Sequence, residues 1–166
     1  MIKIGIDVGS TTAKLVAVDE NDNLLFSKYE RHNAKAKETI LSFLKELLSE
    51  IGDKDISVRI TGSIGMGISE KCSLPFVQEV VAAAKAIQKD YSHVTSMIDI
   101  GGEDAKVVFF NDAEATDLRM NGNCAGGTGA FIDQMAIILG VNIDELNQLA
   151  MNATQVYPIA SRCGVF

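Results

Sequence analysis

The sequence lacks the features that would assign it to a membrane or to nucleic acid. No apolar run approaches the roughly 20 residues that a membrane-spanning helix needs, and the opening MIKIGIDVGS alternates like a strand instead of forming a signal peptide. The 15 basic and 22 acidic residues give a net charge of −7, and no basic cluster of the kind found in nucleic-acid-binding proteins occurs. We therefore expect a cytoplasmic protein with no membrane and no nucleic-acid partner.

Cysteine is also scarce, since the 166 residues include only Cys72, Cys124 and Cys163. An odd number of cysteines in a reducing compartment argues against a disulfide framework. Buried thiols, a reactive thiol and metal ligation remain as interpretations. Cys124 stands out because it directly precedes a glycine-rich turn that leads into a predicted helix, in NCAGGTGAFIDQMA. Glycine-rich turns at helix starts usually bind an anion and need no thiol.

The spacing of apolar residues predicts a layered α/β domain with no internal linker. Alternation between polar turns indicates strands, and apolar residues at helical spacing indicate helices. The expected strands are 3–9, 13–19, 24–31, 58–62, 95–102, 105–112 and 115–121, the first three forming an antiparallel meander. The expected helices are 35–52, 76–91, 128–139 and 141–150, and a glycine-bearing turn is expected around Gly62, Gly65 and Gly67. The second helix should open directly after Pro75.

Two stretches of the chain resemble each other, GIDVGSTTAKLVAVD (5–19) and DIGGEDAKVVFF (99–110). Each contains an apolar strand with an Asp near its end, a glycine-bearing turn, a Lys and a second apolar strand. The backbone N–H groups and hydroxyls of such a turn can bind phosphate, because glycine permits close approach. Asp7 and Asp99 are placed to hold a hydrated Mg²⁺. The competing interpretation is that the glycines and serines only make hairpin turns.

Two hairpins of one design suggest a pair of phosphate clamps facing across a cleft. Neither is a Walker loop, since GxxxxGK[ST] is absent, and GGTG at 126–129 is not a GxGxxG fingerprint. The candidate phosphate-binding residues are Gly9, Ser10, Thr11, Thr12 and Lys14 in the first hairpin, and Gly101, Gly102, Asp104 and Lys106 in the second.

The hairpins resemble the phosphate-1 and phosphate-2 loops of the actin, sugar kinase and heat-shock chaperone superfamily. With NGNCAGGTGAFIDQM and ASRCGVF added, the chain is similar to the ATP-dependent activators of 2-hydroxyacyl-CoA dehydratases, of the 2-hydroxyglutaryl-CoA dehydratase type, and to the related benzoyl-CoA reductase subunits. The resemblance runs from Gly5 to Phe166. It implies an α/β fold, an actin-like (ribonuclease H-like) ATPase lobe with a mixed sheet, an antiparallel β-meander and flanking helices.

The resemblance also implies ATP and Mg²⁺ as ligands and a homodimer that shares one [4Fe–4S] cluster. Each subunit would give Cys124 and Cys163, which agrees with the four thiolates such a cluster needs and with the doubling made by a two-fold axis. N–H groups at the start of the helix 128–139 would stabilise the thiolate. Cys72 matches neither motif and is interpreted as a packing residue.

The implied activity is one-electron transfer driven by ATP. Ferredoxin or flavodoxin would supply the electron, ATP hydrolysis would reorient the helix 128–139, and the electron would pass to the dehydratase component. GGED replaces the GGQD usual in smaller members, so Glu103 joins Asp7 and Asp99 as a catalytic candidate that either repels the γ-phosphate or orients water or Mg²⁺.

The end of the chain and two other functions complete the expectations. The chain stops in the apolar ASRCGVF, so we expect residues 1–166 to be one N-terminal lobe, with the second lobe missing, of a long multi-domain homologue. A metabolite (sugar-type) kinase of the same fold would need a base facing an acceptor hydroxyl and would leave Cys124 and Cys163 unexplained. A non-catalytic nucleotide-sensing domain is the third interpretation. His32 and His93 are expected at the surface.

Overall fold

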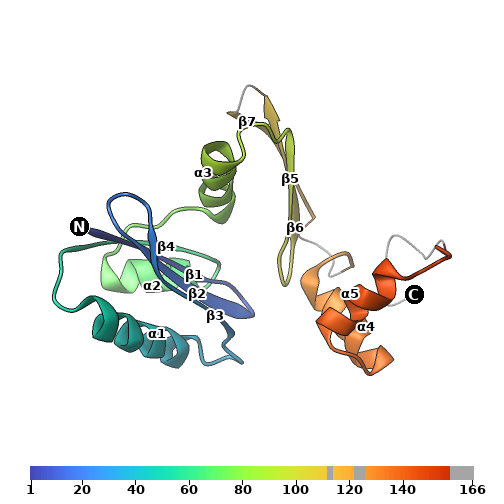
Figure 1. The fold of residues 1–166 in the computed structure, drawn as a ribbon, viewed down its shortest axis with the longest axis horizontal. Helices are drawn as coiled ribbons and strands as arrows, with labels where there is room; N and C mark the ends of the chain where they lie inside the picture. The colour runs from blue at the N-terminus through green and yellow to red at the C-terminus, as the bar shows by residue number, and fades with distance from the viewer. Residues whose placement is uncertain (112–113, 122–125, 158–166) are drawn as a thin grey trace. The chain divides into compact units, whose positions relative to one another are not determined.

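The computed structural model describes residues 1–111, 114–121 and 126–157 (Figure 1). The strands are β1 (Ile2–Val8), β2 (Thr12–Val18), β3 (Leu24–Arg31), β4 (Ile56–Thr61), β5 (Ser96–Ile100), β6 (Ala105–Asn111) and β7 (Glu114–Asn121). The helices are α1 (Ala36–Ile51), α2 (Gly65–Cys72), α3 (Glu79–Asp90), α4 (Gly129–Leu139) and α5 (Ile143–Met151). The chain divides into two compact units, Met1–Ala86 and Ile87–Phe166. A single lobe over 1–166 stays a prediction.

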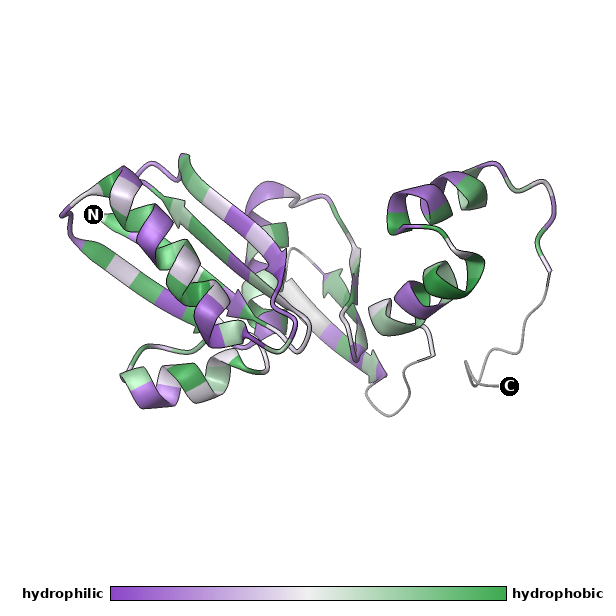
Figure 2. Ribbon diagram, turned by 90° about the horizontal axis from the view of Figure 1, so that it is seen from below, coloured by the Kyte–Doolittle hydropathy of each residue, from purple (hydrophilic) through white to green (hydrophobic). Residues whose placement is uncertain are grey.

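The first unit is built on a mixed sheet with the strand order β3-β2-β1-β4. β1, β2 and β3 form the expected antiparallel meander, and β4 lies parallel to β1. Apolar and polar residues alternate along these strands (Figure 2). In β1 the residues Ile2, Ile4, Ile6 and Val8 are buried, whereas the residues between them lie on the opposite face, because successive side chains of a strand alternate.

Helix α1 supplies the other half of this core. Ile40, Phe43, Leu47 and Ile51 are buried at intervals of three or four residues, which places them on one face of the helix. They pack with the buried residues of β1, β2 and β4 into one apolar cluster. The N–H of Gly52 donates to the Leu48 carbonyl and ends the helix where the sequence predicts.

Two expectations for residues 62–78 were wrong. The glycine-bearing turn around Gly65 and Gly67 contains the short helix α2. The helix expected from residue 76 begins only at Glu79, because Phe76 forms a parallel bridge with Ile60 and the Val77 N–H donates to the Ile60 carbonyl. Backbone pairing with β4 therefore overrides the helix-start signal of Pro75.

The second unit contains an antiparallel sheet with the strand order β5-β6-β7, followed by α4 and α5. These elements match the expected ranges to within about two residues at each end. The side chain of Asn142 accepts from the Glu145 N–H and that of Glu145 accepts from the Asn142 N–H, a capping box that starts α5. None of the helices in the described ranges has the length and apolar character that crossing a lipid bilayer requires.

Candidate functional site

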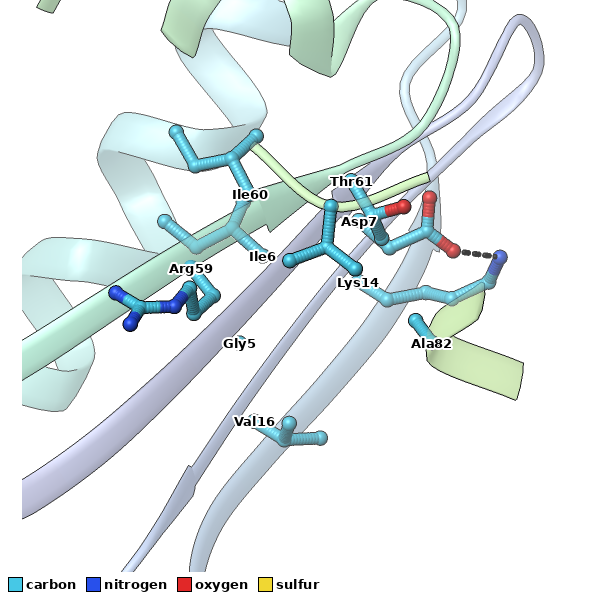
Figure 3. Close-up of a pocket in the computed structure, with 10 residues that line it drawn as sticks. Gly5, Ile6, Asp7, Lys14, Val16, Arg59, Ile60, Thr61 and Ala82 are labelled. Carbon is cyan, nitrogen blue, oxygen red and sulfur yellow. Dashed lines mark hydrogen bonds and ion pairs between the residues drawn. The ribbon is translucent and has the colours of Figure 1, made fainter. Parts of the chain in front are cut away.

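The first candidate loop joins β1 to β2. The Gly9 N–H donates to the Thr12 carbonyl at 3.0 Å and closes the turn. Asp7 faces Lys14 across the strand pair, and Lys14 Nζ lies 2.7 Å from Asp7 Oδ2 (Figure 3). The structure thus brings Asp7, the turn residues and Lys14 together at one end of the sheet, as the sequence predicts.

The second candidate loop repeats this arrangement between β5 and β6. The Gly101 N–H donates to the Asp104 carbonyl at 2.8 Å, and Asp99 faces Lys106 across the strands. The two hairpins differ in how their lysines are held. Lys106 is buried, with its Nζ 2.9 Å from Asp104 Oδ2 and 3.9 Å from Asp99 Oδ2, whereas the side chain of Lys14 is 43% exposed. Glu103 is exposed in the turn.

A pocket of about 300 Å³ lies beside Asp7, between β1, β2, β4 and the start of α3 (Figure 3). Asp7 and Thr61 face each other in the β1–β4 register. Asp7 Oδ1 and Thr61 Oγ1 are buried and have no hydrogen-bond partner among the described residues. A free carboxylate oxygen is the kind of ligand that Mg²⁺ takes from protein while keeping its waters, so Asp7 fits a hydrated magnesium ion.

Gly62 packs directly against this aspartate. Its φ is +95°, in the region that favours glycine, and a Cβ there would lie 2.3 Å from the Val8 carbonyl oxygen and 2.7 Å from Asp7 Oδ1. The turn after β4 therefore requires glycine, and its close approach helps to shield the Asp7 carboxylate.

His32 is buried, which corrects the expected surface position, whereas His93 is exposed as expected. The ring of His32 contacts the first loop, with Nε2 3.0 Å from the Gly9 carbonyl oxygen. Its backbone N–H donates to the Thr11 carbonyl at 3.2 Å. Sequence reasoning missed this contact because His32 directly follows β3, and only the folded meander brings it to the loop.

The start of α4 contacts the second loop. The Gly129 N–H donates to the Gly101 carbonyl at 2.7 Å, and the Ala130 N–H donates to the Gly102 carbonyl at 3.1 Å. A Cβ on Gly129 would lie 3.0 Å from the Gly101 oxygen. These two N–H groups are therefore engaged by the loop. The expected stabilisation of the Cys124 thiolate by the helix start stays a prediction, since Cys124 lies outside the described residues.

The cysteines divide between the described and the undescribed parts of the chain. Cys124 and Cys163 lie outside the residues that the structure describes. Cys72 is exposed at the end of α2, so its interpretation as a packing residue was wrong, because the last turn of this short helix lies at the surface. Within the described ranges, no three His, Cys, Asp or Glu side chains gather as metal ligands.

Comparison with known proteins identifies the family. The model of the BadF/BadG/BcrA/BcrD ATPase family matches residues 4–166. The chain belongs to the BadF/BadG/BcrA/BcrD ATPase family. This assignment covers both hairpins and the two cysteine motifs, as the resemblance noted in the sequence predicts.

Two relatives of this chain are named for the activation of 2-hydroxyacyl-CoA dehydratases. The 2-hydroxyisocaproyl-CoA dehydratase activator of Clostridioides difficile is 32% identical over 179 residues, which cover 100% of this chain and 63% of the relative. The (R)-2-hydroxyglutaryl-CoA dehydratase activating ATPase of Acidaminococcus fermentans is 29% identical over 165 residues, which cover 98% of this chain and 63% of the relative. The chain thus spans 63% of the length of these relatives.

A solved structure supports the fold assignment. The activator of the 2-hydroxyisocaproyl-CoA dehydratase from Clostridium difficile, with bound ADPNP, has a TM-score of 0.85 and 30% identity, over 99% of this chain and 62% of that one. The α/β fold is therefore that of the actin-like ATPases, with the predicted mixed sheet and meander.

Proposed function

We propose that this chain is the nucleotide-binding part of an ATP-dependent one-electron donor that activates a 2-hydroxyacyl-CoA dehydratase. Membership in an ATPase family supports the nucleotide. The names of the activator relatives support the dehydratase partner. The match covers less than two thirds of those relatives, and the activity is proposed for the complete protein.

The observation that carries the proposal is the contact between the second hairpin and α4. The carbonyls of Gly101 and Gly102 accept from the N–H groups of Gly129 and Ala130. The proposed nucleotide loop therefore holds the first turn of the helix that follows Cys124 in the chain. A displacement of the loop changes the bonds at the helix start, which is how a nucleotide would bias a two-state element.

The two hairpins would bind the phosphates of ATP. The proposed phosphate ligands are Gly9, Ser10, Thr11, Thr12 and Lys14 from the first hairpin, and Gly101, Gly102, Asp104 and Lys106 from the second. Asp7 and Asp99 would hold the waters of Mg²⁺, which neutralises charge on the phosphates. Glu103, exposed in its turn, would orient the attacking water. Lys14 and Lys106 already pair with carboxylates, so phosphate binding exchanges one anionic partner for another.

Cys124 and Cys163 would ligate a [4Fe–4S] cluster between two copies of the chain. Two thiolates from each of two subunits make the four that the cluster needs, and the cluster supplies a one-electron redox centre. Ferredoxin or flavodoxin would be the electron source. The complete protein would then be a soluble cytoplasmic homodimer.

Anaerobic reconstitution with iron and sulfide tests this proposal on the complete gene product. We expect about two irons per chain in a dimer, as one shared four-iron cluster requires. Cys124→Ser and Cys163→Ser should each abolish the iron, and Cys72→Ser is the matched control that should retain it. A monomer without iron would contradict the electron-donor function.

ATP hydrolysis separates the proposal from its rivals. Hydrolysis without any acceptor alcohol, accelerated when the reduced protein meets its dehydratase, fits the activator. A requirement for an acceptor hydroxyl compound, with phosphate appearing on it, would instead identify a metabolite kinase. Nucleotide binding with neither turnover nor iron would identify a sensing domain.

A further inference from the structure

We propose that His32 is the positioning residue of the first phosphate loop, setting the direction of the backbone N–H groups that receive the nucleotide. The inference rests on the proposed function, because it assigns a role to His32 at that same nucleotide site. His32 follows β3 directly and is only 4% exposed.

Two bonds join His32 to the loop. The ring atom Nε2 lies 3.0 Å from the Gly9 carbonyl oxygen, and the backbone N–H donates to the Thr11 carbonyl at 3.2 Å. A carbonyl oxygen can only accept, so Nε2 carries the hydrogen. Within the loop, the Gly9 N–H donates to the Thr12 carbonyl. The carbonyls of Gly9, Thr11 and Thr12 therefore each accept a hydrogen bond.

Planar trans peptides convert these bonds into an orientation for donors. In each peptide group the C=O and the following N–H point in opposite directions. When the Gly9 carbonyl turns toward His32, the Ser10 N–H turns away from it. The Thr11 carbonyl fixes the Thr12 N–H in the same way. His32 therefore aims two N–H groups at the opposite side of the loop, where an anion would be bound.

The second hairpin holds the equivalent carbonyl by other means. Gly101 occupies the place of Gly9, since each N–H closes its turn onto the residue three positions later. The Gly101 carbonyl accepts from the Gly129 N–H at 2.7 Å. In each hairpin the equivalent carbonyl thus accepts from a donor outside the turn. This donor is the His32 side chain in the first hairpin and the backbone at the start of α4 in the second.

The other ring nitrogen argues against a role in packing alone. His32 Nδ1 is buried and has no hydrogen-bond partner within the described part of the chain. Burying a polar atom without a partner costs free energy that an apolar ring of similar size avoids. An apolar ring would supply no donor to the Gly9 carbonyl, whereas Nε2 of His32 does.

Nucleotide binding by the complete protein tests this inference with Mg²⁺–ATP as the probe. His32→Phe keeps a ring but removes the donor, and His32→Gln places an amide donor at a similar reach. We expect His32→Phe to raise the Kd about 10-fold, as the loss of an orienting hydrogen bond predicts. His32→Gln should stay within about 3-fold of the original protein.

A second measurement needs no nucleotide. Hydrogen exchange followed by NMR should show faster exchange of the Gly9 amide in His32→Phe than in His32→Gln. The Gly101 amide, which makes the equivalent bond in the other hairpin, is the internal control and should stay unchanged. His32→Leu replaces His32→Phe if the latter does not fold.

The outcomes distinguish a failure of the positioning role of His32 from a failure of the proposed function. An unchanged Kd together with an unchanged Gly9 exchange rate in the donor-free variant would overturn the role of His32. Equal losses in His32→Phe and His32→Gln would overturn it as well, because they would indicate packing. If the original protein binds no nucleotide, the proposed function fails, and the Gly9 exchange rate alone decides whether His32 orients the loop.

Discussion

The backbone N–H of Gly129 donates to the carbonyl oxygen of Gly101 at 2.7 Å, and a Cβ at residue 129 would lie 3.0 Å from that oxygen. We expect Gly129→Ala to lengthen this bond and to destabilise the protein by about 1 kcal/mol. Gly67→Ala, within α2 and with nothing inside 4 Å of the added Cβ, is the matched control. It should stabilise by up to about 1 kcal/mol, because alanine is the better helix former. Urea unfolding compares the two, and equal effects would count against the contact.

The turn after β4 gives a second comparison between glycines. Gly62→Ala places a Cβ 2.3 Å from the Val8 carbonyl oxygen at a φ of +95°. We expect a loss of about 3 kcal/mol or more, from strain added to the clash. Gly52→Ala also sits at positive φ, +64°, but in open space. Its ψ of −157° places it in a backbone region open almost only to glycine, so alanine should cost about 2 kcal/mol from strain alone. Thermal unfolding measures the destabilisation of both variants. Equal losses would indicate that backbone strain, and not the clash with the Val8 carbonyl, sets the cost.

The two hairpin lysines should differ in their contribution to stability. Lys106→Met leaves Asp99 and Asp104 without the charge that lies 3.9 Å and 2.9 Å from their oxygens, and Lys106 is buried. We expect about 2 kcal/mol of destabilisation, below the cost of breaking a fully buried pair because both carboxylates reach solvent. Lys14→Met removes a more exposed pair and should cost less than about 1 kcal/mol. Urea unfolding measures both, and a larger loss at Lys14 would contradict this ranking.

The β2–β3 turn contains a carboxylate with a lowered pKa. Hydrogen bonds from the side chain and then the backbone of Asn23 lower the pKa of Asp19 from its ordinary 3.8. Because the folded pKa lies below the unfolded one, this stabilisation is present above pH 3.8 and is lost as the pH falls through the folded pKa.

Asn23→Ala removes the bond from Asn23 Nδ2 to Asp19 Oδ2 and should raise the pKa of Asp19 toward its ordinary value. NMR titration of the Asp19 carboxyl measures the change. Asn21→Ala is the control, since Asn21 donates to Asp19 through its backbone N–H, which alanine retains. A shift of the same size in both variants would refute the assignment to the Asn23 side chain.

Local patterns predict most of the fold. β3 and the strands of both hairpins follow from apolar alternation, and α1 follows from its buried spacing, because each pattern is complete within its own segment. α2 was missed because it is short and contains Gly65 and Gly67, which are poor helix formers. The start of α3 was misplaced because Phe76 pairs with Ile60, an interaction that no local pattern contains.

The distinction between patterns within one segment and contacts between distant segments also applies to the candidate site. Both hairpins could be predicted, since Asp7 and Lys14, like Asp99 and Lys106, meet across a short turn. His32 reaches Gly9 from 23 positions away, and Gly129 reaches Gly101 from the next helix. These contacts depend on how the meander and the helix fold back, so the sequence carries no local signal for them.

The two loops should differ in their tolerance of missense variants, because different donors hold the Gly9 and Gly101 carbonyls. The Gly9 carbonyl depends on a side chain, so most single missense changes at codon 32 remove its partner. The Gly101 carbonyl is held by a main-chain N–H, which every residue except proline keeps at position 129, where a side chain would lengthen the bond without removing its donor. Only proline, which has no N–H, or a shift in the length of the segment deletes that donor. A population of variants should therefore lose the first anchor by many routes and the second by few.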